Sequence, residues 1–349
     1  MNRLVSKIIN KSLETETGPY SAARISAAVT GGGFDVRETF ARKGCKLSAI
    51  DCGSRFYIYS VTKSFIAALI LKLAGSKAFS LEDKVDKWFP AVKNSKIVSV
   101  YNCLRHTGGF QDYGGDARYH AEVKAGSEPW SFDEFINRTL GDKLLFTPGE
   151  KFSYSNIGYM LLKKILEIEY GASFSDLINS RICRPLSLGS TRVCETRESL
   201  VDNTFGPSVY LGSKESPADV YKIYHPLWVS HGVISSNAYE TAVIMNAVLS
   251  GTLLERDQLD IMTRGFKVEG VTGRPFYDPH YGCGLMTDTG ASYGPVYGHT
   301  GGGPGSSAAC YHLARKSKPF TVAVLTDGED SVQAERIVYE IFEAVSGLF

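Results

Sequence analysis

Apolar residues recur along the chain with two different periods, and the period changes twice. Near the amino terminus, Leu4, Ile8 and Ile9 share one face of a helix predicted over residues 2–13. The segments that follow are rich in small and β-branched residues, which favour strands. We expect strands at residues 22–30, 36–41 and 45–50, with Gly31-Gly32-Gly33 as a turn.

From residue 76 to residue 204 the apolar spacing becomes helical. Two segments open with a serine that is followed three residues later by an acidic residue, Ser80 with Asp83 and Ser131 with Glu134. This is the capping-box pattern of a helix start. Helices are expected at residues 80–89, 131–140, 156–170, 174–182, 237–250 and 255–263.

The carboxyl-terminal part returns to strand-like patterns. Strands are expected at residues 281–287, 296–299, 306–313 and 320–326, with a turn at 315–319 and an amphipathic helix at 332–345. This order predicts a mixed α/β (α+β) protein, an antiparallel β-sheet flanked by helices plus an all-helical inserted domain. The predicted sheet domain comprises residues 1–75 and 205–349, and the helical domain residues 76–204.

Composition and charge narrow the class of protein. The 349 residues are 43% hydrophobic and 21% charged, which allows a large core and argues against disorder. A net charge of +1 gives no electrostatic indication of nucleic-acid binding. The longest apolar run, Phe65 to Leu71, is far shorter than the ~20 residues that span a bilayer. The amino terminus has no apolar signal-peptide core, so we expect a cytoplasmic protein with no membrane partner unless a leader was trimmed.

The cysteine pattern indicates neither a zinc site nor a disulfide framework, because no two cysteines form Cys-x-x-Cys. The seven cysteines are residues 45, 52, 103, 183, 194, 283 and 310. HExxH, a P-loop and a Gly-x-Ser-x-Gly elbow are also missing from the sequence. We therefore expect no metal and no cofactor, and a small-molecule substrate. The oligomeric state is open.

The first candidate for chemistry is Ser60-Val61-Thr62-Lys63, which stands at the start of an apolar helix. Residues three apart share a helix face, so the Lys63 amine can reach the Ser60 hydroxyl. A serine becomes a good nucleophile when a neighbouring base takes its proton. Burial beside the apolar run would lower the pKa of Lys63 and make it such a base. Ser-x-x-Lys occurs once in the chain, but a single match of this kind is expected by chance.

A second candidate is Tyr154-Ser155-Asn156, which follows a turn and precedes a helix. A Tyr154 phenol beside a lysine ammonium can relay a proton, and the Asn156 amide can hold a substrate carbonyl or amide. The alternative is a buried Tyr154 beside an Asn156 that only caps the next helix.

The third candidate is His299-Thr300-Gly301-Gly302, where glycines on a strand would let a substrate backbone approach. The N–H of one of these glycines, with that of Ser60, would form an oxyanion hole. The alternative is a tight turn with a surface histidine. His106-Thr107-Gly108-Gly109 repeats the same residues inside the helical region, and we interpret that copy as a structural loop.

Together, in this order, the three motifs resemble those of the serine β-lactamase and penicillin-binding-protein superfamily, most closely its class C, DD-peptidase and family VIII esterase branch. The similarity runs from about residue 20 to the carboxyl terminus. It extends to flanking segments at residues 104–109, 148–159, 184–186 and 281–285.

The resemblance implies a β-lactamase/transpeptidase-like fold with the active site between the sheet domain and the helical domain. It implies that Ser60 is the nucleophile that forms an acyl-enzyme, and that Lys63 and Tyr154 share the proton transfers. Asn156 would orient the substrate, and Thr300 would bind its far end. The N–H groups of Ser60 and Gly302 would hold the oxyanion, beside His299 and Gly301.

Three departures from the family pattern bear on the substrate. His299 stands where many β-lactamases have a lysine, and a histidine is charged only part of the time near neutral pH. Asp288 lies where some DD-peptidases have an arginine for the substrate carboxylate, and Arg274 is a possible substitute. His231-Gly232 stands where relatives often have two glycines.

The function predicted on these grounds is hydrolysis of small esters or amides by a serine hydrolase. A D-aminopeptidase, a DD-carboxypeptidase or a class C β-lactamase is the first alternative, with a peptide or β-lactam as substrate. An acyltransferase shares the first half-reaction and is the second. The third is a non-catalytic sensor that binds penicillin or peptides and keeps Ser60 without fast deacylation.

Overall fold

A single antiparallel sheet of eight strands dominates residues 1–271 and 275–347, the part of the chain that the computed structural model describes. The strand order across the sheet is β2-β1-β11-β10-β9-β8-β7-β6. Its strands are β1 (Arg24–Gly31), β2 (Phe34–Ala41), β6 (Phe266–Lys267), β7 (Pro279–Tyr281), β8 (Met286–Asp288), β9 (Val296–Gly303), β10 (Ser306–Leu313) and β11 (Phe320–Thr326).

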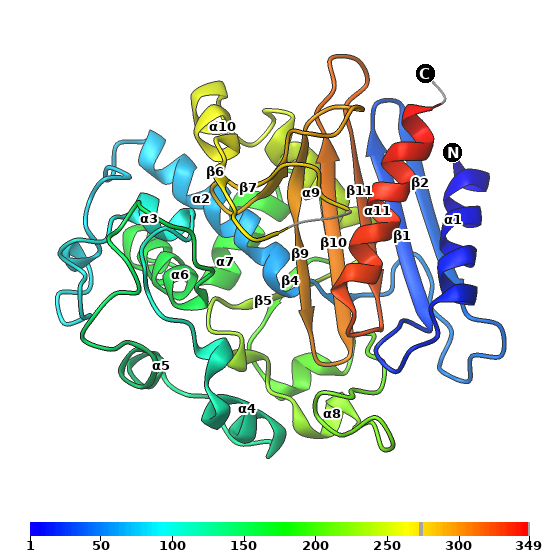
Figure 1. The fold of residues 1–349 in the computed structure, drawn as a ribbon, viewed down its shortest axis with the longest axis horizontal. Helices are drawn as coiled ribbons and strands as arrows, with labels where there is room; N and C mark the ends of the chain where they lie inside the picture. The colour runs from blue at the N-terminus through cyan, green and yellow to red at the C-terminus, as the bar shows by residue number, and fades with distance from the viewer. Residues whose placement is uncertain (272–274, 348–349) are drawn as a thin grey trace.

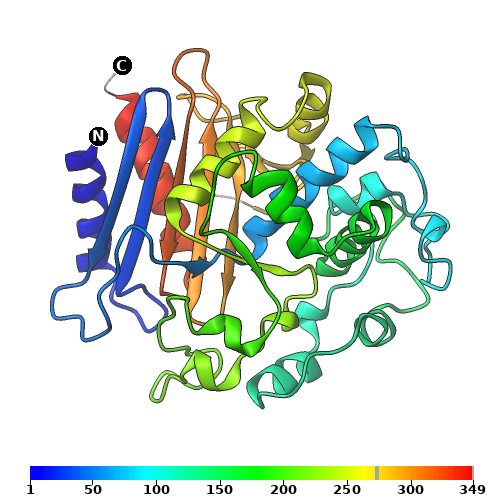
Figure 2. The same ribbon diagram turned by 180° about the vertical axis from the view of Figure 1, so that it is seen from behind.

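Helices cover both faces of the central strands. On one face, α1 (Asn2–Thr15) and α11 (Ser331–Ser346) lie side by side (Figure 1). On the other, α9 (Ala238–Leu249) packs across β1 and β11 (Figure 2). Successive residues of a strand point to opposite faces, so Val324 packs against α11 while Ala323 faces the second core. Both faces of the central strands are therefore covered by protein, which explains why every residue of β10 and β11 is buried.

The helices of the middle region lie beside the large sheet rather than on it (Figure 1). They are α3 (Val100–Leu104), α4 (Ala117–Lys124), α5 (Phe132–Thr139), α6 (Asn156–Tyr170) and α7 (Phe174–Ile178). A small antiparallel sheet of β3 (Phe56–Tyr57), β5 (Val233–Ser236) and β4 (Arg192–Cys194) adjoins them. The division into two domains stays a prediction, and β4, inside the range assigned to helices, pairs with β5 from outside it.

The remaining helices connect these layers. They are α2 (Thr62–Gly75), α8 (Val220–Ile223) and α10 (Arg256–Thr263). α2 is buried at every position from Thr62 to Leu71 and packs against α6, α9 and α10. A helix that is apolar on all sides has to be surrounded by protein, and α2 therefore lies at the centre of the molecule.

Three predicted elements are wrong in the structure. Residues 45–50 form an irregular loop: the segment is mostly exposed and adds no strand beyond β2, which is the edge of the sheet. Residues 80–89 contain only a short 3₁₀ turn, η2 (Val85–Lys87), since the Val85 N–H bonds the carbonyl of Val98 instead of a helical partner. The strand at 281–287 is two strands, β7 and β8, separated by a turn with Gly284 at φ +67°.

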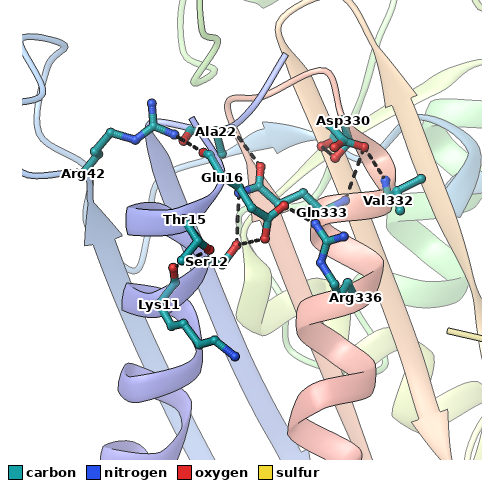
Figure 3. Close-up of polar contacts among 11 residues, drawn as sticks. Lys11, Ser12, Thr15, Glu16, Ala22, Arg42, Asp330, Val332, Gln333 and Arg336 are labelled. Atoms are coloured by element: carbon teal, nitrogen blue, oxygen red, sulfur yellow. Dashed lines mark hydrogen bonds and ion pairs between the residues drawn. The ribbon is translucent and has the colours of Figure 1, made fainter. Parts of the chain in front are cut away.

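Buried polar contacts tie the two ends of the chain together (Figure 3). The Gln333 side chain of α11 is fully buried; its Nε2 donates to Ser12 Oγ at 3.1 Å, and its Oε1 accepts from the Ala22 N–H at 2.9 Å. Glu16, at the end of α1, accepts from Ser12 Oγ and pairs with Arg336. One amide side chain thus joins α1, α11 and the chain entering β1.

All seven cysteines are free thiols. Within the described residues, no helix combines the length and apolar character that crossing a bilayer requires. In the same part of the chain, no three or more His, Cys, Asp or Glu side chains gather in a way that could hold a metal ion.

Replacing Gln333 by Leu should lower the free energy of unfolding by about 1–3 kcal/mol, because the Ala22 N–H would stay buried without a partner. Urea denaturation followed by circular dichroism measures the change. Val332→Ala, at an exposed position of the same helix, is the matched control and should change stability little. Equal midpoints for wild type and Gln333→Leu would contradict this account of the contact.

Candidate active site

Ser60 lies in a short 3₁₀ turn, η1 (Tyr59–Val61), that leads directly into α2. The preceding residue, Tyr59, has φ +43°, a conformation that is costly for a residue with a side chain. Its hydroxyl donates to the Pro304 carbonyl at 2.9 Å, beneath the β9–β10 turn. The surrounding structure therefore holds the turn in a strained shape that leaves Ser60 partly exposed while its neighbours are buried.

Lys63 is fully buried, and its Nζ lies 3.0 Å from Ser60 Oγ and 2.8 Å from Asn156 Oδ1. Burial lowers the pKa of the Lys63 amine well below its usual range, and the charge of Asp112 opposes part of that shift. A lysine in this state is available as a neutral base. The predicted pairing of Ser60 with Lys63 is thus present in the geometry.

Tyr154 lies against the same pair. Its ring centroid is 4.9 Å from Lys63 Nζ. Burial raises the pKa of the Tyr154 phenol above its usual range, and a hydrogen bond with the Ser60 side chain opposes that rise. The phenol is therefore protonated near neutral pH, so Tyr154 can donate or relay a proton but is not the resting base.

Asn156 is the first residue of α6, and Ser155 is the cap: its side chain accepts from the Gly158 N–H. The alternative in which Asn156 caps the helix is therefore wrong. Asp112 accepts from both the Asn156 backbone N–H, at 2.7 Å, and Asn156 Nδ2, at 3.1 Å. These contacts turn Oδ1 of the amide toward Lys63. Asp112 was not predicted as a site residue, since its one signal in the sequence is its position just after His106-Thr107-Gly108-Gly109.

The glycines of β9 let the strand approach the Ser60 turn very closely. A Cβ on Gly301 would lie 2.1 Å from the Ile58 carbonyl oxygen and 2.9 Å from the Ser60 nitrogen. β9 and β10 are joined by the two-residue turn Pro304-Gly305, and the alternation of such a ladder directs the Gly302 N–H away from β10. Gly302 also lines the cavity beside Ser60. The arrangement fits the predicted oxyanion hole of Ser60 and Gly302.

His299 and Thr300 are set back from this group, since neither lines the cavity. His299 is fully buried, and its Nε2 lies 2.9 Å from the Tyr281 hydroxyl. Thr300 Oγ1 points at the Met286 sulfur, 3.6 Å away. The alternative of a surface histidine in a tight turn is wrong. The substrate-binding roles of His299 and Thr300 stay predictions, because neither residue lines the cavity.

A one-way chain of hydrogen bonds fixes the tautomers of two histidines. The Ser155 N–H donates to Nδ1 of His106 at 3.1 Å, so the His106 proton is on Nε2, which faces Tyr281 at 3.1 Å. Tyr281 then donates to His299, whose Nδ1–H donates to the Thr300 carbonyl. Both histidines are neutral in this series of hydrogen bonds. His106, in the first copy of the motif, therefore fixes the orientation of His299, in the second copy, through the Tyr281 hydroxyl.

The cavity beside Ser60 has a volume of about 510 Å³. Six tyrosines line it: Tyr20, Tyr59, Tyr113, Tyr119, Tyr210 and Tyr224. Glu329 contributes a carboxylate, whereas none of the described lining residues is a lysine or an arginine. Asp288 is buried and accepts from the N–H groups of Tyr277, Asp278 and Gly290, so it holds a loop. Arg274, the suggested substitute cation, lies outside the described residues.

His231 is the other residue whose place the sequence did not reveal. It lines the cavity, and its ring nitrogens lie 3.1 and 3.3 Å from Lys63 Nζ. The only signal was its departure from the glycine pair that relatives often have. A histidine in place of a glycine does not reveal, from the sequence alone, in which direction the His231 side chain points.

His299 should stay neutral across the physiological range, because burial lowers its pKa to about 3. Histidine carbon and nitrogen chemical shifts, followed by NMR from pH 8 to pH 5, should show no titration of this ring. The His299→Gln variant identifies the signal. Titration near pH 6.5, the ordinary value for histidine, would contradict the hydrogen-bond chain described above.

Comparison with known proteins places this geometry in a family. The family model described as Beta-lactamase matches residues 20–346. Penicillin-binding protein 4* of Bacillus subtilis (strain 168) is 26% identical over 314 residues, which cover 84% of this chain and 65% of that protein. The chain thus spans slightly less than two thirds of that relative's length.

Solved structures agree on the fold. A D-stereospecific amidohydrolase from Streptomyces sp. matches with a TM-score of 0.80 at 23% identity, covering 97% of this chain and 98% of that one. A D-amino acid amidase from Ochrobactrum anthropi SV3, complexed with D-phenylalanine, matches with a TM-score of 0.82 at 21% identity, covering 99% and 98%. The predicted mixed α/β, β-lactamase/transpeptidase-like fold is confirmed.

The family match spans nearly the whole chain, and it includes Ser60, Lys63 and the glycine-rich strand β9. The predicted relationship to the serine β-lactamases and penicillin-binding proteins is confirmed with it. This chain belongs to the Beta-lactamase family.

Proposed function

We propose that this protein forms an acyl-enzyme on Ser60 and hydrolyses small amides or esters whose acyl part is neutral or bears an amino group. The observation behind the proposal is the buried Lys63 amine 3.0 Å from Ser60 Oγ, at the edge of a tyrosine-lined cavity. A serine with a neutral amine at this distance can be deprotonated as it attacks a carbonyl.

In the proposed reaction, neutral Lys63 takes the Ser60 proton while Oγ bonds to the substrate carbonyl carbon. The negative charge that develops on the carbonyl oxygen is bound by the N–H groups of Ser60 and Gly302. Tyr154 then passes the proton from the Lys63 ammonium to the departing amine or alcohol. A water molecule, deprotonated by the same two groups, attacks the ester and releases the acid. The net reaction consumes one water and leaves Ser60 and Lys63 as they began.

The charge of the cavity favours one substrate class over another. A substrate with a free carboxylate, such as a D-Ala-D-Ala peptide or a penicillin, meets no cation among the described lining residues, and His299 is neutral behind Tyr281. The tyrosine rings suit an aromatic acyl group or one with an ammonium group. The Glu329 carboxylate accepts from the Val209, Tyr210 and Gly305 N–H groups, so it adds negative charge to the cavity wall while holding a loop. These features favour D-aminopeptidase activity over DD-carboxypeptidase or β-lactamase activity.

The comparisons support the same substrate class. One similar structure is a D-amino acid amidase with D-phenylalanine bound, and another is a D-stereospecific amidohydrolase. A cavity of about 510 Å³ is large enough for an amino acid amide with an aromatic side chain.

The substrate proposal predicts that kcat/KM for D-phenylalanine amide exceeds that for a D-alanyl-D-alanine peptide, or for nitrocefin, by at least about tenfold, because the carboxylates gain no ion pair. Release of ammonia, D-alanine or cleaved nitrocefin measures the three rates, and Ser60→Ala should abolish all of them. Nitrocefin or peptide turnover above amide turnover would overturn the preference.

The same assays distinguish a hydrolase from a binding sensor and from an acyltransferase. A burst of one equivalent without steady turnover would indicate a sensor, and product formation that rises with added alcohol or amine would indicate an acyltransferase. Equal rates for wild type and Ser60→Ala would reject the proposed nucleophile.

Activity should rise with pH and level off well below the ordinary lysine pKa of 10.5, because burial disfavours the Lys63 ammonium and the neutral base is populated early. Lys63→Arg should lower kcat/KM by about 10²–10⁴-fold, since a guanidinium cannot lose its proton. The pH profile of amide hydrolysis measures both effects. An arginine variant with wild-type activity would rule out Lys63 as the base.

A further inference from the structure

The two donors of the proposed oxyanion hole come from distant parts of the chain. The Ser60 N–H belongs to the turn η1, and the Gly302 N–H belongs to the strand β9. Two such donors stabilise the developing charge only when both lie about 3 Å from the same substrate oxygen. The two segments pack against each other, and some contact has to fix the distance between them.

Tyr59, the residue before Ser60, makes such a contact with its side chain. Its hydroxyl lies 2.9 Å from the Pro304 carbonyl, and the phenol has to be the donor because a carbonyl only accepts. Burial raises the pKa of this phenol well above its usual range, so the proton stays on it. Pro304 lies two residues beyond Gly302. One hydrogen bond therefore joins the Ser60 turn to the end of β9.

The Tyr59 ring adds a steric contact to this hydrogen bond. A Cβ on Gly303 would lie 2.5 Å from two carbon atoms of the ring, so the ring lies directly against the backbone of β9. The close contact stops the end of β9 from moving toward η1, and the hydrogen bond stops it from moving away. The side chain thus sets the spacing in both directions.

The far side of the β9–β10 turn is anchored as well. The Gly305 N–H donates to Glu329 Oε1 at 3.0 Å, and the Gly305 carbonyl accepts from the Gly206 N–H at 2.9 Å. The hydrogen bond from Tyr59 therefore attaches η1 to a turn that other segments already hold.

The backbone of Tyr59 gives a second reason to assign it a role. Its φ of +43° suits glycine and is costly for a residue with a Cβ. The peptide group between Tyr59 and Ser60 carries the Ser60 N–H, so the backbone angles of Tyr59 help to set the direction of that donor. The contacts of the phenol and ring with β9 offset the cost and hold this backbone in place.

We propose that Tyr59 is a positioning residue for the oxyanion hole: by holding η1 against the end of β9, it keeps the Ser60 and Gly302 N–H groups at the spacing that binds one carbonyl oxygen. This inference rests on the proposed function, in which these two groups bind the oxyanion. It gives a role to a buried hydroxyl that the proposed reaction does not use.

The first test is Tyr59→Phe, which removes the hydroxyl and keeps the ring in the cavity wall. Its readouts are kcat and KM for D-phenylalanine amide, and the affinity for phenylboronic acid, whose adduct with Ser60 places a boron-bound oxygen in the oxyanion hole. The variant should lower kcat by about 10- to 100-fold and weaken boronate binding by a similar factor, with KM little changed. A purely structural role would lower the melting temperature without this difference between kcat and KM.

The second variant is Tyr59→Gly, which relieves the backbone but removes both the hydroxyl and the ring. It should lose at least as much kcat as Tyr59→Phe, because neither contact with β9 remains. A glycine variant with wild-type kcat would show that the backbone conformation alone is sufficient, and would overturn the proposal.

The matched control is Tyr221→Phe. This tyrosine also donates to a backbone carbonyl, that of Asn203 at 2.6 Å, and it does not line the cavity. The control should keep the wild-type kcat and boronate affinity. If Tyr59→Phe keeps them too, or if it raises KM while leaving kcat unchanged, the proposed role of Tyr59 is wrong.

Fluorophosphonate labelling of Ser60 separates this inference from the proposed function. If wild type is labelled but hydrolyses no amide or ester, the proposed function fails, while the labelling rates of the variants and their boronate affinities still judge Tyr59. If wild type is not labelled, Ser60 is not activated and the role of Tyr59 falls as well.

Discussion

The burial of one amine beside one hydroxyl is the constraint on which the rest of the structure depends. Lys63 Nζ is 3.0 Å from Ser60 Oγ, inside a helix that is buried on every side. Taking a lysine out of water destabilises its ammonium form, and that cost lowers its pKa. The protein has to surround α2 with other elements to maintain this state, and the large sheet, α6, α9 and α10 do so.

Most polar groups near this pair are neutral, and each has a fixed direction. Asp112 orients Asn156, and Ser155 starts the chain through His106, Tyr281 and His299. In a low-dielectric interior an unpaired polar group is costly, so such networks have one stable arrangement. They place the Asn156 side-chain oxygen beside Lys63 without adding a second cation. The same neutrality leaves the tyrosine-lined cavity without an anchor for a substrate carboxylate.

Local sequence patterns predicted the long helices and strands. They failed for segments whose structure depends on hydrogen-bond partners elsewhere in the chain. The helix at 156–170 and the strands at 306–313 and 320–326 match the structure, because their apolar spacing is repeated over many residues. The helix expected at 80–89 is absent because the backbone of Val85 bonds Val98, a partner that no local pattern reveals. The expected strand at 45–50 is a mostly exposed loop that pairs with no strand of the sheet, and its local pattern does not reveal that either.

The amino-acid sequence was enough to predict the family and the contact between Ser60 and Lys63, the proposed nucleophile and base, because the two residues are one helical turn apart and their contact is local. The order of the motifs that the family model matches can also be read along the chain. The folded structure was needed to show that His299 faces Tyr281 instead of the cavity, and that Asp112 and His231 complete the surroundings of Asn156 and Lys63. Those contacts join residues 44 and 168 positions apart. Their geometry follows from how the helices and strands pack, and a side chain's direction in such a contact is not encoded in its neighbours along the chain.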